Sequence, residues 1–177
     1  LLLLLDFLQS YSLKIFLNGG REKPFPKEKR ILIDSPKIST YDKKPEMSAL
    51  KITKALLPTI GKYDLTVVNF ANGDMVGHTG NLEKTIEAIK VLNKCVRAIK
   101  MKCNNIKINM IVTADHGNCE NMKGDKVTTH TTNDVYFYLN KKVKLKNGCL
   151  YNVAPTILEL MRIKKPKESS QSLITRV

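Results

Sequence analysis

The sequence predicts an α/β fold in which helices pack on a mostly parallel β-sheet. The first reason is that segments with the length of strands alternate with segments that show the 3.6-residue period of helices. The second is that residues 65–70 (LTVVNF) and 108–113 (INMIVT) are almost continuously apolar, which is typical of parallel strands covered on both faces. At 177 residues the chain is long enough for one sizeable core, so one domain is expected.

In the first part of the chain we expect strands at 13–17 (LKIFL) and 30–34 (RILID), separated by a loop rich in glycine and proline. The polar, proline-containing stretch 35–46 predicts an ordered loop. A helix is expected to begin at Met47 and to stop at Gly61. Its apolar residues should form one face, which comprises Leu50, Ile52, Leu56, Leu57 and Ile60.

After the strand at 65–70, residues 81–101 predict an amphipathic helix against the sheet. Its apolar residues recur at steps of three and four and are Ile86, Ile89, Leu92, Val96 and Ile99. The strand at 108–113 follows, then a shorter strand at 135–139. A last helix is expected at 153–162, with Pro155 near its first turn.

No membrane partner is expected, because no segment approaches the roughly 20 apolar residues of a membrane span. The run from Leu1 to Leu5 has no basic leader and is interrupted by Asp6, which argues against a secretory signal. The cysteines are spaced irregularly, which suits neither a disulfide framework nor a zinc knuckle and favours a cytoplasmic location. They are Cys95, Cys103, Cys119 and Cys149.

The formal net charge of +14 is compatible with a nucleic-acid partner, since lysine and arginine neutralise phosphates. However, the lysines are dispersed from Lys14 to Lys167, without interleaved aromatic residues or a recognition motif. A solvated basic surface that attracts small anions is therefore favoured, and no nucleic acid is expected. A basic module that binds anions or nucleic acid without catalysis remains the alternative from a different class.

All three histidines lie in polar clusters at or after predicted strand ends. The first cluster contains Asp74 and His78, the second contains Asp115 and His116, and the third surrounds His130. Taken singly, each cluster could be a chance spacing, a helix cap or a loop histidine. Because strand carboxyl ends meet at one crevice, the clusters are expected to converge. Carboxylates and imidazoles without thiolates suit Mn²⁺ or Zn²⁺ in an open site. Five ligands favour two cations, which can clamp a phosphoryl group between them.

The segment NFANGDMVGHTG at 69–80 closely resembles the NFANPDMVGHTG motif of cofactor-independent phosphoglycerate mutases, which belong to the alkaline phosphatase superfamily. TADHGNCENM and THTTNDV resemble the next two metal motifs of that family, in the same order. The resemblance extends from about Asn18 through the loop SPKISTYDKKPEMSA to APTILELMRIKKP and QSLI. It implies that residues 1–177 are the carboxyl-terminal portion of the metal-binding domain, a partial alkaline-phosphatase-like three-layer sandwich, with 1–17 divergent.

By this resemblance, Asp74, His78 and His130 are expected to hold one cation, usually manganese, and Asp115 and His116 the second. In the family a serine takes the phosphoryl group from 3-phosphoglycerate and returns it to the 2-hydroxyl, giving 2-phosphoglycerate in glycolysis and gluconeogenesis. Members are typically monomeric. Another phosphatase or phosphomutase of the superfamily is an alternative, but the loop SPKISTYDKKPEMSA favours the mutase.

The sequence also departs from the family. No part of it resembles the amino-terminal segment with the nucleophilic serine and a further aspartate ligand, or the inserted domain whose arginines hold the substrate. We therefore expect a fragment without a catalytic nucleophile, inactive alone, and the missing initial methionine fits this expectation. Gln9 stands where the family has a substrate-contacting lysine, and Gly73 and the stretch Asp134–Tyr136 replace proline-containing positions.

Overall fold

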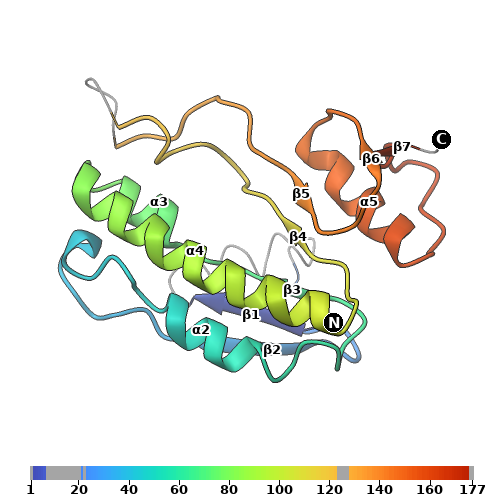
Figure 1. Ribbon diagram of the computed structural model, residues 1–177, viewed down its shortest axis with the longest axis horizontal. Helices are drawn as coiled ribbons and strands as arrows, with labels where there is room; N and C mark the ends of the chain where they lie inside the picture. The colour runs from blue at the N-terminus through green and yellow to red at the C-terminus, as the bar shows by residue number, and fades with distance from the viewer. Residues whose placement is uncertain (1, 7–20, 22, 123–127, 176–177) are drawn as a thin grey trace.

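The computed structural model describes residues 2–6, 21, 23–122 and 128–175. Its central element is a three-stranded parallel sheet of order β2-β1-β3, formed by β1 (Leu2–Asp6), β2 (Lys29–Ile33) and β3 (Thr66–Val68). In the register, Leu2 lies opposite both Lys29 and Thr66. Figure 1 shows this sheet beneath two helices.

The central strand β1 was not among the predicted elements, although a continuous apolar run is what a central parallel strand requires. The strand expected at 13–17 lies outside the described residues. The strands expected at 30–34 and 65–70 are confirmed as β2 and β3, with β3 shorter than predicted.

Helices α2 (Ala49–Leu56) and α4 (Leu82–Asn105) cover the same face of the sheet (Figure 1). Between them and the strands lies a buried cluster of Ile52, Leu56, Ile99 and Cys103. The prediction that Leu50 belongs to the apolar face against the sheet was wrong, because Leu50 is 56% exposed. Ala49, Ile52, Thr53 and Leu56 form the buried stripe at helical spacing, and Leu50 lies outside it.

Helix α4 starts where it was predicted, with Asn81 as its cap, whose side chain accepts a hydrogen bond from the Lys84 N–H at 3.1 Å. Its buried face was predicted only in part. Ile86 and Ile89 are 46% and 41% exposed, and the buried residues are Thr85, Ala88, Cys95, Ile99 and Cys103. Ala88 is buried because α3 (Asn72–Gly77), a short helix that was not predicted, packs against the N-terminal half of α4 and brings Val76 into the same cluster.

The remaining strands pair in two antiparallel ladders, so the parallel arrangement is limited to the first sheet. Strand β4 (Ile111–Val112) pairs with β5 (Tyr138–Leu139), and β6 (Lys144–Leu145) pairs with β7 (Ile174–Thr175). The last predicted helix is confirmed as α5 (Val153–Leu160), which follows the short 3₁₀ helix η2 (Leu150–Asn152). Another 3₁₀ helix, η1 (Tyr41–Lys43), lies within the loop expected at 35–46.

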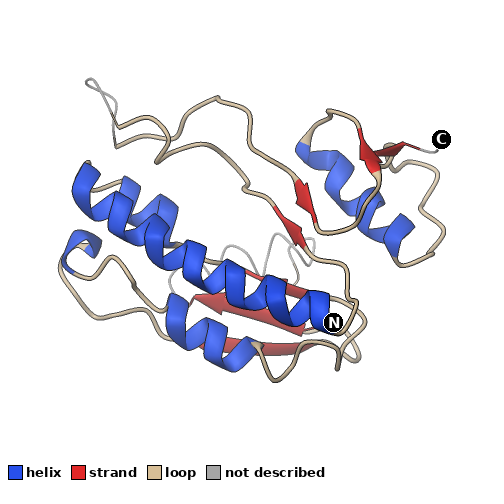
Figure 2. Cartoon of the chain, in the orientation of Figure 1, coloured by secondary structure: helices blue, strands red, loops and turns tan. Residues whose placement is uncertain are grey.

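Most of the chain between β4 and β5 is loop, as Figure 2 shows. The polar clusters singled out from the sequence lie in this loop and just after β3. None of the helices in the described part of the chain has the length and apolar character needed to cross a membrane.

Candidate metal centre

Helix α3 carries the first two candidate ligands. Asp74 lies in its first turn, and His78 lies at its C-terminal end, where its backbone N–H donates to the Asp74 carbonyl at 2.9 Å. Residues four apart lie on the same face of a helix, so the D-x-x-x-H spacing brings the two side chains together. The Nε2 atom of His78 is 3.0 Å from Oδ1 of Asp74.

The other histidines reach the same carboxylate from the long loop. His130 Nε2 lies 3.2 Å from Asp74 Oδ1 and 3.1 Å from His78 Nε2. The His116 ring stacks on the His130 ring with centroids 3.7 Å apart, and its Nε2 is 4.0 Å from Asp74 Oδ1. Asp115 has a 78% exposed side chain, with Oδ1 3.7 Å from His116 Nε2. All five candidate residues therefore lie in one place.

Backbone carbonyls orient two of the imidazoles. His78 Nδ1 lies 2.7 Å from the Thr128 carbonyl oxygen, and His116 Nδ1 lies 3.3 Å from that of Gly117. A carbonyl oxygen only accepts hydrogen bonds, so we assign the ring hydrogen to Nδ1 in both histidines. In the neutral imidazole this leaves the Nε2 lone pair directed at the site, the state in which histidine binds a metal.

The donor set fits a divalent cation. One ligand atom each from Asp74, His78 and His130 lies within 4.8 Å of the others, and the closest distances between them are 3.0 to 3.2 Å. Metal bonds of about 2.0–2.2 Å place neighbouring ligand atoms about 3–3.5 Å apart. A carboxylate oxygen and two imidazole lone pairs at this separation repel one another unless a proton or a metal ion lies between them.

Several polar residues around the ligands were not singled out from the sequence. Asn118, which is 5% exposed, donates through Nδ2 to Asp74 Oδ1 at 2.7 Å. The carboxylate of Glu120 accepts hydrogen bonds from the Asn118 backbone N–H and from the Thr131 hydroxyl. The available sequence signal was that Asn118 and Glu120 belong to the same polar motif as His116.

Two pKa values near the site are shifted. The hydrogen bond from the Thr131 hydroxyl, followed by smaller effects, lowers the pKa of Glu120 and keeps it ionised. Burial, together with the charges of Glu120 and Asp74, raises the pKa of Cys119. The Cys119 thiol therefore stays protonated at neutral pH, in agreement with a site made of oxygen and nitrogen ligands.

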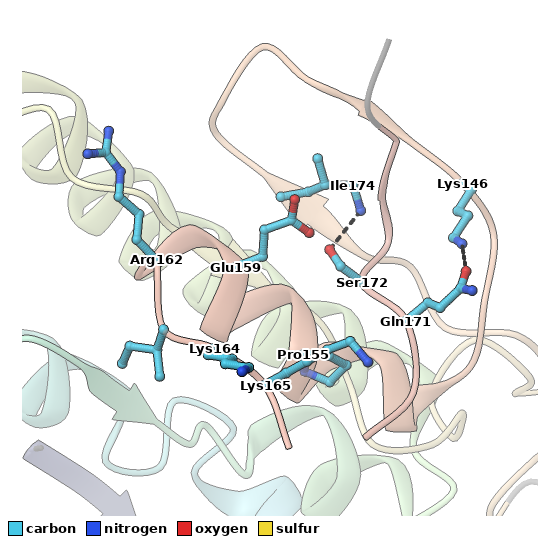
Figure 3. A pocket seen from close by; sticks show the side chains of 10 residues that line it. Lys146, Pro155, Glu159, Arg162, Lys164, Lys165, Gln171, Ser172 and Ile174 are labelled. Carbon is cyan, nitrogen blue, oxygen red and sulfur yellow. Dashed lines mark hydrogen bonds between the residues drawn. The ribbon is translucent and has the colours of Figure 1, made fainter. Parts of the chain in front are cut away.

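A cavity of about 640 Å³ lies elsewhere, between α5 and the β6–β7 ladder (Figure 3). None of the five candidate ligands lines it. Its lining contains Lys146, Arg162, Lys164 and Lys165, and Lys146 donates to Gln171 Oε1 at 2.9 Å. The candidate metal centre is therefore separate from this cavity, and its side chains come from α3 and from the loop between β4 and β5.

This arrangement of carboxylate and imidazoles on an α/β scaffold is that of a metalloenzyme. The model of the metalloenzyme superfamily matches residues 11–165, and the chain belongs to this superfamily. The superfamily and the trio Asp74, His78 and His130 together indicate the use of a divalent metal.

Among curated proteins, the chain is similar to 2,3-bisphosphoglycerate-independent phosphoglycerate mutases. It is 49% identical over 162 residues to that of Ehrlichia ruminantium (strain Gardel), covering 86% of this chain and 32% of the relative. It is 48% identical over 164 residues to that of Helicobacter pylori (strain J99), covering 89% of this chain and 33% of the relative. The chain thus spans about a third of the length of these relatives.

The solved structure of a phosphoglycerate mutase from Leishmania mexicana, determined at low cobalt concentration, matches with a TM-score of 0.88 and 26% identity. The match covers 98% of this chain and 37% of that protein. It confirms the predicted fold class, a partial alkaline-phosphatase-like α/β sandwich, and the resemblance stated from the motifs. These relatives do not favour the alternative of a basic module without catalysis.

Proposed function

We propose that this chain forms the metal-binding, carboxyl-terminal part of a phosphoglycerate mutase that interconverts 3-phosphoglycerate and 2-phosphoglycerate. The observation that carries the proposal is the convergence of Asp74, His78 and His130 within 4.8 Å, in a chain 48–49% identical to relatives of that name. In the proposed reaction a serine outside these 177 residues takes up the phosphoryl group, so the chain alone is inactive.

In this proposal two Mn²⁺ ions bind, one to Asp74, His78 and His130 and the other to Asp115 and His116. When bound, two divalent cations activate a hydroxyl nucleophile and stabilise the charge of a phosphoryl group in transfer. The residues of this chain supply the geometry. The Thr128 carbonyl fixes the tautomer of His78, so its Nε2 lone pair faces the Asp74 carboxylate.

The charge of the chain supports a small anionic substrate. Its formal net charge is +14, and a positive surface raises the local concentration of phosphorylated acids. The side chain of Asp115 is 78% exposed, so this part of the cluster is accessible to solvent. A monomeric enzyme of glycolysis and gluconeogenesis in the cytoplasm, without a nucleic-acid partner, is the context that we propose.

Metal binding and reconstitution test this function separately. Titration of the chain with Mn²⁺, followed by the electron paramagnetic resonance signal of free Mn²⁺, should show two bound ions, and His130→Ala should lose one. Mixing the chain with the amino-terminal part of a relative should then give Mn²⁺-dependent formation of 2-phosphoglycerate from 3-phosphoglycerate. The chain alone should give none.

Each alternative function predicts a different experimental result. Release of inorganic phosphate in place of 2-phosphoglycerate would identify a phosphatase. RNA binding that falls with salt and survives a chelator, without Mn²⁺ binding, would identify the basic module. Failure of the chain to bind Mn²⁺ at all would refute the proposal at its foundation.

A further inference from the structure

Glu120 joins the two segments of the β4–β5 loop that carry His116 and His130. Its Oε2 accepts from the Asn118 backbone N–H at 2.6 Å, and its Oε1 accepts from the Thr131 hydroxyl and from Asn133 Nδ2, the latter at 3.0 Å. The Thr131 backbone N–H also donates to the Gly117 carbonyl at 2.8 Å. One carboxylate therefore ties the turn after His116 to the segment after His130.

This tie lies directly beside the stacked imidazoles. Thr131 follows His130 in the chain, and Gly117 follows His116, so the short bridge between Gly117 and Thr131 sets how closely the two rings approach. The ring centroids are 3.7 Å apart. Because the loop between β4 and β5 is long, the position of His130 depends on such tertiary contacts.

Asn118 contacts another candidate ligand, Asp74. Its Nδ2 donates to Asp74 Oδ1, and the assignment of the amide is fixed because a carboxylate accepts hydrogen bonds only. The residue is 5% exposed, and the Asn118 Oδ1 atom packs against Gly77, where an added Cβ would overlap with it. The amide therefore has little room to turn, and it holds Oδ1 of Asp74 toward the imidazoles.

We infer that Asn118 and Glu120 are positioning residues. They set the affinity of the chain for the cation held by Asp74, His78 and His130 without binding that cation themselves. Glu120 holds His130 against His116 through Thr131, and Asn118 fixes the rotamer of Asp74. This inference rests on the proposed function, because it concerns the same metal centre. Partners that orient metal ligands typically contribute about 10- to 100-fold to metal affinity.

Near-isosteric variants separate this role from a general contribution to folding. Glu120→Gln keeps the size of the side chain but replaces one accepting oxygen by a donor, so at least one of its donors loses its acceptor. Thr131→Val removes the hydroxyl and keeps the shape, whereas Thr131→Ser keeps the hydroxyl. Asn118→Ala removes the amide that faces Asp74.

The measurement is a Mn²⁺ titration of the 177-residue chain by electron paramagnetic resonance, with circular dichroism and thermal unfolding as checks of folding. We expect Glu120→Gln and Thr131→Val to weaken binding by about tenfold and Asn118→Ala by about 10- to 100-fold. Thr131→Ser should bind within about twofold of the unchanged chain. The double variant of Glu120→Gln and Thr131→Val should be little worse than either alone, because both remove the same interaction.

The outcomes distinguish this inference from the proposed function. If the unchanged chain does not bind Mn²⁺, both are wrong. If it binds Mn²⁺ and the folded Glu120→Gln and Thr131→Val variants bind equally well, the positioning role is wrong and the proposed function stands. Equal losses in Thr131→Ser and Thr131→Val would also overturn it, because the hydroxyl would then not matter. Should Glu120→Gln fail to fold, the Thr131 pair decides.

Discussion

Asp74 provides the most direct test of the metal centre, because three imidazoles face the same oxygen of its carboxylate. The Nε2 atoms of His78, His130 and His116 lie 3.0, 3.2 and 4.0 Å from Oδ1. Asp74→Asn keeps an oxygen there but removes the negative charge. At a metal–oxygen distance of about 2.1 Å, attraction between a dication and one negative charge is about 4 kcal/mol even at the dielectric constant of water.

An energy of about 4 kcal/mol corresponds to roughly a 10³-fold change in affinity, and the amide oxygen of asparagine recovers part of it. We therefore expect Asp74→Asn to weaken Mn²⁺ binding by about 10²- to 10³-fold. Isothermal titration calorimetry and electron paramagnetic resonance both measure this change. The matched control is Asp64→Asn, at an exposed position before β3, which changes the net charge of the chain by the same amount.

The control separates a ligand from general electrostatics. Asp64→Asn should bind Mn²⁺ within about twofold of the unchanged chain, because Asp64 is exposed and precedes β3, whereas Asp74 follows it, and water and salt weaken the effect of an exposed charge. If Asp74→Asn and Asp64→Asn have equal affinities while both remain folded, then Asp74 does not hold the cation. In that case the convergence of the three histidines on its carboxylate would need another explanation.

Three further predictions concern packing and ionisation. Gly77→Ala should lower the free energy of unfolding by about 1–3 kcal/mol, because the new Cβ overlaps with a buried amide. At the control position Gly73, an added Cβ meets its nearest side-chain atom at 3.6 Å, so Gly73→Ala should be neutral or stabilising. Thermal unfolding measures both changes. Thr156→Val should cost about 1–3 kcal/mol in denaturant unfolding, since the Thr156 hydroxyl accepts from a buried backbone N–H at 2.9 Å, and Thr156→Ser should retain most of the stability. The pKa of Glu120 lies below its ordinary value of 4.5, so its stabilising effect is present above that pH and is lost as the pH falls through the lowered pKa. The difference in melting temperature between the unchanged chain and Thr131→Val should therefore shrink below pH 4.5, and a difference that grows there would contradict this reasoning.

The sequence predicted the elements better than the faces they bury. In α4 the large residues Ile86 and Ile89 matched the helical period, yet they are more exposed than Ala88, which is fully buried. Periodicity identifies an apolar stripe, but it does not say that α3 packs closely against this half of the helix and requires a small residue there. Strand β1 was not predicted for a related reason. An isolated apolar run does not show which strands will be its neighbours in a sheet.

The candidate ligands were easier to find than the residues that hold them, and the difference follows from how each is positioned. Asp74 and His78 are brought together by one turn of α3, so their spacing in the sequence already contains the geometry. His130 is 52 residues away from His78 and comes within 3.1 Å of it only through tertiary contacts. The carboxylate of Glu120 makes one of these contacts, with a hydroxyl that follows His130 in the chain. Local spacing can thus predict which side chains of one helix come together, whereas the distances to the other candidate ligands depend on residues whose role appears only when distant segments of the long loop meet.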